Sequence, residues 1–240
     1  INSSAAAVNQ SVTVACTTHT IDLPAGSFVQ LEVLNASLAV GEAVTIGGDF
    51  FFEQTTLAAG TTATRVAVSK ASLTFEGQGL ENGEGALLIL TDGVAGVLSG
   101  DLTGGVTGRL GFRVNTSVSA VDETISFNGS DIRVLFGAGE VRDAGTGQNF
   151  LQIFGEDLSL NIGDFVTIEG DVSFTNQGGE SVFAGKDLSL FVGNGPARLP
   201  NGDLNPSASG LFLRDARVGL IKFSDGTYAL SASGTVEGVG

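Results

Sequence analysis

The sequence predicts an all-β protein made of two copies of one antiparallel strand repeat. Three observations lead to this fold class. The two halves of the chain align with each other, the aligned segments alternate apolar and polar residues, and turns drawn from 36 glycines separate them. Alternation with a period of two places successive side chains on opposite faces of a strand, whereas an amphipathic helix shows a period near 3.6.

The internal repeat is clearest in two pairs of segments. INSSAAAVNQSVTV (1–14) aligns with VNTSVSAVDETISF (114–127), and FVQLEVLNASLAVGEAVTIGGDFFF (28–52) aligns with FLQIFGEDLSLNIGDFVTIEGDVSF (150–174). Eleven of the 25 positions in the second pair are identical. Self-similarity of this kind is the sequence signature of a repeat architecture. The units therefore cover residues 1–113 and 114–240.

The second unit is longer because it carries inserted loops near residues 140–148 and 193–210. It ends before any counterpart of GRLGFR (108–113). We therefore expect the array to continue past Gly240, and we expect another repeat to precede residue 1.

Strands are expected wherever the alternation is regular. The best example is VTIGGDFFF (44–52), whose alternate apolar side chains are predicted to face the core: Val44, Ile46, Phe50 and Phe52. Further strands are expected in RVAVSKASLTF (65–75), RLGFRVN (109–115) and YALSASGTV (228–236), and LENGEGALLILTDG (80–93) is expected to form a strand and a turn. We expect seven to nine antiparallel strands in each unit.

Hairpin turns are predicted at Asp92-Gly93 and Asp225-Gly226, which lie between β-rich segments. Asp-Gly fits the type I′ turn, in which both central residues have positive φ. Short connections of this kind join antiparallel neighbours and predict a meander.

A long antiparallel sheet must hide its apolar face and its edges. Alternation continues through RLGFRVNTSVSAV (109–121) without a Pro- or Ser-rich linker. We therefore predict antiparallel meander repeats that close into one elongated β-barrel or β-solenoid. The alternative is two tandem β-sandwiches joined at about residue 114.

The composition excludes several classes of function. Acidic residues outnumber basic ones by 26 to 11, and the resulting charge of −15 disfavours nucleic acid and anionic membrane surfaces as partners. No apolar stretch approaches the roughly 20 residues of a spanning helix. One Tyr and no Trp argue against a membrane barrel, which carries aromatic girdles. We therefore expect no membrane insertion.

No catalytic set is apparent. Cys16 and His19 suggest a Cys-His pair, but the aligned positions in the second unit are Gly129 and Ile132. Asp49 and Asp171 recur in both units, and we interpret them as solvated surface acids rather than an acid-base pair. The sequence contains no nucleophile elbow, P-loop or zinc-ligand spacing. We predict that the chain is not an enzyme and that it requires no cofactor.

Calcium is the one metal for which the sequence offers candidates. Oxygen-rich loops bind Ca²⁺ through carboxylates and amides. Asn201, Asp203 and Asn205 alternate in the loop PNGDLNP, and Glu140 and Asp143 lie in the other inserted loop. The same residue types also form ordinary turns, so both interpretations remain open.

Three segments resemble repeats of very large secreted bacterial exoproteins: NTSVSAVDETI, LSLNIGDFVTIEGDVSF and VGLIKFSDGTYALSASGTV. Those adhesin-like proteins often carry cadherin-like or hemolysin-type calcium-binding modules elsewhere. The resemblance implies export, tandem arrangement and an extracellular or cell-surface location. The chain has no GGxGxDxUx nonapeptide, so the calcium binding of such modules cannot be assigned to particular residues of this chain.

Taken together, these features predict a structural repeat segment of a large extracellular protein, acting as a stiff spacer, matrix component or filament component. The alternative is an adhesive or ligand-binding module that uses the inserted loops or an apolar interior. The expected partners are neighbouring repeats of the same chain, and end strands are expected to allow a homo-oligomer or fibre.

Overall fold

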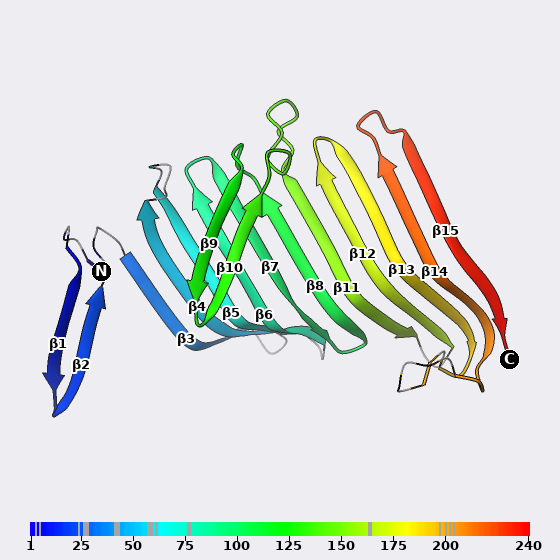
Figure 1. Ribbon diagram of the computed structural model, residues 1–240, viewed down its shortest axis with the longest axis horizontal. Helices are drawn as coiled ribbons and strands as arrows, with labels where there is room; N and C mark the ends of the chain where they lie inside the picture. Colours follow the sequence, from blue (N-terminus) through cyan, green and yellow to red (C-terminus); the bar gives the residue numbers. More distant parts are fainter. Residues whose placement is uncertain are drawn as a thin grey trace.

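The computed structural model describes the chain apart from residues 3, 5, 24, 26–28, 41–43, 57–59, 61, 76–77, 163–164, 197, 200, 202 and 204. The described residues form fifteen β-strands (Figure 1). Eight strands fall in the first unit and seven in the second, within the range expected from the sequence.

The strands of the first unit are β1 (Val8–Val14), β2 (Thr17–Leu23), β3 (Val29–Val40), β4 (Val44–Thr56), β5 (Thr62–Phe75), β6 (Gln78–Leu90), β7 (Gly93–Thr103) and β8 (Val106–Asn115). Those of the second unit are β9 (Val121–Phe127), β10 (Ser130–Phe136), β11 (Phe150–Ile162), β12 (Val166–Gln177), β13 (Glu180–Asn194), β14 (Ser209–Lys222) and β15 (Tyr228–Val239).

Eleven of these strands form one antiparallel sheet in the order β15-β14-β13-β12-β11-β8-β7-β6-β5-β4-β3. The sheet crosses the boundary between the units because β8 pairs with β11, from Asn115↔Phe150 to Val106↔Leu160. The all-β antiparallel meander is thus confirmed. The described strands form an open sheet with β3 and β15 at opposite edges, so closure into a barrel or solenoid stays a prediction.

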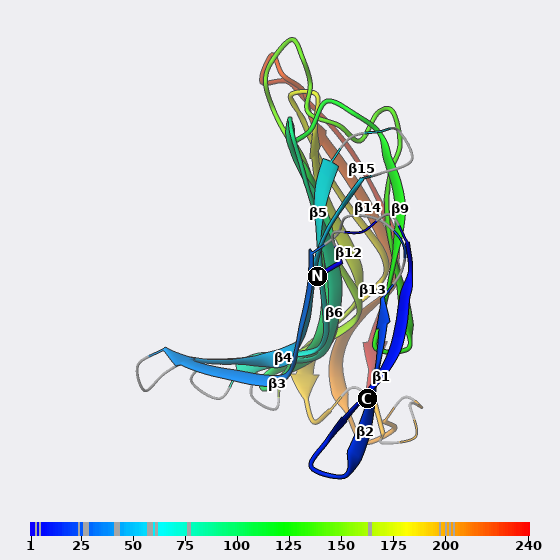
Figure 2. The ribbon, with the colours of Figure 1, turned by 90° about the vertical axis from the view of Figure 1, so that its left-hand side faces the viewer.

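Two hairpins lie outside the sheet. The first pairs β1 with β2, and the second pairs β9 with β10. The chain leaves the sheet after β8, forms β9–β10, and returns as β11. Strand β9 contacts β5, and β10 contacts β6 and β7, so the second unit's hairpin packs on the sheet of the first unit. In Figure 2 both hairpins lie to the same side of the sheet. We call this side the front face and the opposite side the back face.

A row of β-bulges crosses the sheet. Six non-glycine residues with φ near +50° interrupt the strand register: Asn35, Lys70, Asn82, Asp157, Asp187 and Asp215. Five of the six are Asn or Asp, the non-glycine residues that tolerate the left-handed region best. Bulges bend a strand and increase its twist. Figure 2 shows the corresponding bend in β3 and β4.

The main core lies between the β9–β10 hairpin and the first unit's sheet. It is formed by Phe51, Ala67, Ala86, Leu88, Ala95, Val121, Ile125, Phe127, Ile132, Val134, Phe136 and Phe150. The expected core-facing set in β4 is therefore wrong, because Phe51 is buried whereas Phe52 on the opposite face is exposed. The alternation was correct, but only the position of the hairpin decides which face is covered.

The predicted turns are present with a different geometry. Asp92 lies in the turn between β6 and β7, whose first residue is Gly93, and Asp225-Gly226 lies between β14 and β15. Neither aspartate has positive φ, so these are not type I′ turns. Two consecutive positive φ angles occur instead at Ala15-Cys16 and Asn128-Gly129 in the out-of-sheet hairpins, and at Gly178-Gly179 between β12 and β13 of the sheet. Asn-Gly is the strongest short hairpin signal and marks the turn that the sequence reading passed over.

Candidate functional sites on the two faces of the sheet

Arg113, near the end of β8, fastens the base of the β9–β10 hairpin to the sheet. Its guanidinium donates hydrogen bonds to Glu140 Oε1 (2.8 Å), Gln152 Oε1 (2.7 Å) and the Leu135 carbonyl (2.9 Å). It also lies over the rings of Phe136 and Phe150, at 5.0 and 5.4 Å from the ring centroids. Charge-assisted hydrogen bonds and cation–π contact together make this a strong, directional anchor.

The corner where β8 turns into the hairpin is built by Asn115 and Ser117, both fully buried. Asn115 Oδ1 accepts from the Ser117 amide and hydroxyl, each at 2.9 Å, while Asn115 Nδ2 donates to the Ser119 carbonyl at 3.2 Å. The same three contacts recur at Asn2, with Ser4 and Ala6. The repeated Asn-x-Ser pattern is therefore a structural corner.

Asp49 joins three strands and the hairpin turn. Its carboxylate accepts from the bulged Asn35 amide (2.7 Å), from Lys70 Nζ (2.9 Å) and from Asn128 Nδ2 in the β9–β10 turn (2.7 Å). The Asn35 amide, followed by the Lys70 ammonium, lowers the pKa of Asp49 below its usual 3.8. The interpretation of Asp49 as a solvated acid is wrong, because only 3% of its side chain is exposed.

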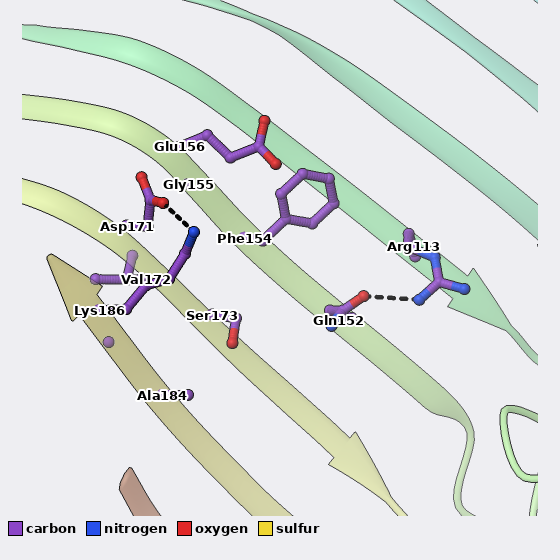
Figure 3. Close-up of a pocket in the computed structure, with 11 residues that line it drawn as sticks. Arg113, Gln152, Phe154, Gly155, Glu156, Asp171, Val172, Ser173, Ala184 and Lys186 are labelled. Atoms are coloured by element: carbon purple, nitrogen blue, oxygen red, sulfur yellow. Dashed lines mark hydrogen bonds and ion pairs between the residues drawn. The ribbon is translucent and has the colours of Figure 1, made fainter. Parts of the chain in front are cut away.

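Asp171 repeats this arrangement in the second unit without a hairpin turn above it. It accepts from the bulged Asp157 amide (2.8 Å) and pairs with Lys186 Nζ (2.9 Å). The Lys186 ammonium, followed by the Asp157 amide, lowers the pKa of Asp171. Figure 3 shows this ion pair at one end of a front-face pocket of about 520 Å³, with Phe154, Ser173 and Ala184 beside it.

The back face carries a continuous apolar row across all eleven strands of the sheet. The strand registers place the following residues side by side, which we call the apolar row: Val33, Phe50, Val68, Gly85, Leu98, Phe112, Ile153, Phe174, Phe183, Leu220 and Leu230. Phe112, Ile153 and Phe174 are each 39% exposed. A shallow depression of about 280 Å³ lies in the row between Phe50 and Phe112.

The calcium candidates of the first inserted loop both have protein partners. Glu140 binds Arg113 and the Gly137 amide, and these contacts, led by Arg113, lower its pKa below the usual 4.5. Asp143 Oδ1 accepts from the Gly145 and Thr146 amides. The Thr146 amide is the main cause of the lowered pKa of Asp143. Both residues have a structural role in the loop.

The second inserted loop brings only two of its three candidates together. Asn201 Nδ2 donates to Asp203 Oδ2 (2.8 Å), whereas the largely buried Asn205 contacts the Pro196 carbonyl and the Ser207 amide. Positions 197, 200, 202 and 204 of this loop lie outside the described residues. No group of three or more acidic, His or Cys side chains with metal-site geometry occurs in the described part of the chain. Calcium binding stays a prediction.

Cys16 lies exposed in the β1–β2 turn, and His19 lies in β2 opposite Val12. Neither has a hydrogen bond that would form a catalytic pair among the described contacts. No helix in the described residues is long and apolar enough to cross a membrane.

The anchoring residues Arg113, Asn115 and Asn128 were missed by the sequence reading. Asn115 and Asn2 were visible as aligned positions, and Asn128-Gly129 carried a turn signal, but Arg113 had no signal of its own. The contacts of Arg113 join β8 to segments 22 to 39 residues further along the chain.

No protein-family model matches the chain, and no curated protein or solved structure matches it either.

Proposed function

We propose that the chain is a structural repeat segment of a large extracellular protein and that it acts as a stiff spacer, matrix component or filament component. The observation that carries the proposal is the uninterrupted sheet across the unit boundary. The β8–β11 ladder joins the two units, and the β9–β10 hairpin of the second unit is packed into the core of the first.

This connection explains why the segment should be stiff. Bending between the units would break ladder hydrogen bonds, each worth about 1 kcal/mol net, and would expose buried Phe and Ile side chains. Bending a flexible linker between independent domains breaks no ladder hydrogen bonds and exposes no buried side chains. The hairpin therefore works as a clamp across the joint, with Arg113 and Asp49 at its two ends.

An extracellular setting is supported by the acidic composition and by the resemblance of the repeats to those of secreted exoproteins. A charge of −15 keeps an elongated chain soluble and discourages non-specific contact with anionic surfaces.

Small-angle X-ray scattering tests the proposal. The chain should scatter as one rigid elongated particle in calcium and in chelator, and the two pair-distance distributions should be superimposable. Two flexibly linked particles, or stiffening only in calcium, would contradict a spacer whose rigidity comes from the shared sheet.

The back face supports a second candidate, a ligand-binding module. The apolar row and its depression fit an acyl chain or another extended apolar ligand. The loop at 140–148 is a weaker candidate because Glu140 and Asp143 already have protein partners. A fluorescent long-chain fatty acid should bind saturably, and Phe112→Glu should abolish binding whereas Ser173→Glu on the front face should not. Absence of saturable binding would remove this candidate.

A further inference from the structure

The two out-of-sheet hairpins follow the same design. β1–β2 and β9–β10 are related by the offset of 113, and both turns have two successive positive φ angles, 48° and 66° at Ala15-Cys16 and 53° and 81° at Asn128-Gly129. We call the face of a hairpin that carries the positions packed on the sheet in β9–β10 its inner face. In β9–β10 this face includes Ile125, Phe127 and Val134. Their counterparts in β1–β2 are Val12, Val14 and Ile21.

The burial of the two inner faces differs sharply. Ile125, Phe127 and Val134 are 2%, 5% and 0% exposed, because they pack on the first unit's sheet. Val12, Val14 and Ile21 are 42%, 59% and 43% exposed. Figure 1 shows β1–β2 beside β3 and not over the sheet. The first hairpin thus presents an apolar surface of a type that is covered elsewhere in the same molecule.

The second unit presents the matching half of the interface. Strands β12 to β15 repeat β4 to β7, and Figure 1 shows no strand in front of them. The strand registers match the buried Ala67, Ala86, Leu88 and Ala95 of the first unit with Ala184, Gly219, Ile221 and Ala229. These four counterparts are partly or fully exposed.

The acceptor side of the polar contact also has a counterpart in the second unit, although the donor Asn128 corresponds to Ala15 in the β1–β2 turn. In the first unit the turn residue Asn128 donates to Asp49 Oδ2 and, at 3.1 Å, to Ser69 Oγ. The counterparts of Asp49 and Ser69 are Asp171 and Lys186, which form the ion pair at the open front-face pocket in Figure 3. A hairpin docked in the same way would place its turn at this pocket.

We propose that the β1–β2 hairpin of one molecule docks on the front face of β12–β15 of another molecule, in the manner of β9–β10 on the first unit. This contact rests on the proposed structural function. It adds the partner, which is a second copy of the chain. Hairpin and acceptor are different surfaces, so the contact is head-to-tail and generates open chains of molecules unless the rotation between neighbours closes them into a ring.

The contact between molecules is weaker than its internal counterpart. The Phe51–Phe127 ring pair, with centroids 5.5 Å apart, is replaced by Ser173 and Val14, and less apolar area is buried. Two molecules that each carry a charge of −15 also repel each other. Raising the salt concentration screens this repulsion and is expected to strengthen the association.

Disulfide trapping tests the geometry directly. In a Cys16→Ser background, Ala15→Cys and Lys186→Cys place thiols at the counterparts of the touching pair Asn128 and Ser69. Mild oxidation should yield a ladder of dimers, trimers and larger linear species. Ala15→Cys alone can form dimers only, because each molecule then has one thiol.

The matched control combines Ala15→Cys with Tyr228→Cys, in the same Cys16→Ser background. Tyr228 lies on the back face and is 72% exposed, close to the 68% of the Lys186 side chain. The control pair should cross-link much more slowly. Equal rates for the two pairs would show random collision and would overturn the proposal.

Sedimentation equilibrium provides a readout without cysteines. The weight-average mass of the native chain should rise with concentration, Val14→Asp on the inner face should abolish the rise, and Thr13→Asp on the outer face should preserve it. A native chain that stays monomeric, or a Val14→Asp variant that still associates, overturns docking. Scattering of monomeric Val14→Asp should still show a rigid particle, so failure of docking is separable from failure of the spacer function.

Discussion

At the scale of single residues, the fold depends on side chains that satisfy backbone groups at irregular points. The bulged residue Asn35 has an amide outside the regular ladder, and Asp49 accepts its hydrogen bond. Asp171 does the same for the amide of Asp157. An amide left without a partner costs up to about 1–3 kcal/mol when it is buried, so the cost is larger at the part-buried Asn35 contact than at the exposed Asp157 contact.

Replacing Asp49 by Asn should lower the thermal midpoint more than Asp171→Asn. Both substitutions keep the shape and remove the charge. Asp49 is the more buried of the two and also holds Asn128, so its loss additionally loosens the hairpin turn. Thermal unfolding followed by circular dichroism measures the difference. Equal falls in the midpoint would show that the Asn128 contact adds nothing.

Replacing Arg113 by Gln should destabilise the base of the hairpin by about 2 kcal/mol, the usual range for hydrogen bonds to a charged group. Glu140, Gln152 and the Leu135 carbonyl all lose a donor. Hydrogen exchange should become faster in β9 and β10 before it changes in β12–β15.

The control for this variant is Arg133→Gln. Arg133 pairs with Asp122 on the outer face of the same hairpin, and both side chains are largely exposed. No change in exchange is expected there, because exposed ion pairs contribute little. A similar acceleration in both variants would indicate a general effect of lost charge.

At the scale of elements, two hairpins of the same pattern have different energetic roles because only one has a surface to pack against. Ile125 is buried in the main core, whereas the counterpart Val12 is exposed. Ile125→Ala should therefore cost about 2–4 kcal/mol of unfolding free energy.

Val12→Ala should change the unfolding free energy by less than about 0.5 kcal/mol in dilute monomer. Denaturant unfolding of both variants measures the contrast. A cost for Val12→Ala near that for Ile125→Ala would show that β1–β2 is packed in solution on a surface of its own molecule.

At the scale of the whole molecule, the single-layer sheet leaves much surface uncovered. The chain exposes 13975 Å², whereas a compact monomer of its mass exposes roughly 10,000 Å². The excess comes from the back face and from the uncovered front face of β12–β15. An uncovered apolar surface of this extent is typical of an interaction surface.

Stability should fall on acidification because six carboxyl groups among the described residues have lowered pKa values in the folded protein: Asp49, Asp122, Glu140, Asp143, Asp171 and Asp225. The unfolded chain, with ordinary values of 3.8 for Asp and 4.5 for Glu, binds more protons in this range. The contribution is complete above the unfolded pKa values and is lost as the pH falls through the folded ones.

Thermal midpoints should therefore be constant near neutral pH and decline from about pH 5 downward. Several of these acids are exposed, so added salt should reduce the decline. A midpoint that is independent of pH down to about pH 3 would contradict the stabilising role of these carboxylates.

The all-β class, the meander and the position of most strands could be predicted from the amino-acid sequence alone. These features are local, because alternation with a period of two and turn residues act over a few positions. The repeated Asp49 and Asp171 were also visible, although their role was misread: the hydrogen bonds to Asn35 and Asp157 span 14 residues each.

The buried face of each strand and the packing of the short hairpins could not be predicted without the three-dimensional arrangement of the strands. Phe51 and Phe52 are equally apolar in the sequence, and the docking of β9–β10 selects Phe51 for the core. The contacts of Arg113 and Asn128 likewise join segments distant in the chain. Packing between such segments depends on how the bent sheet and the hairpin meet in space, and no local pattern encodes that geometry.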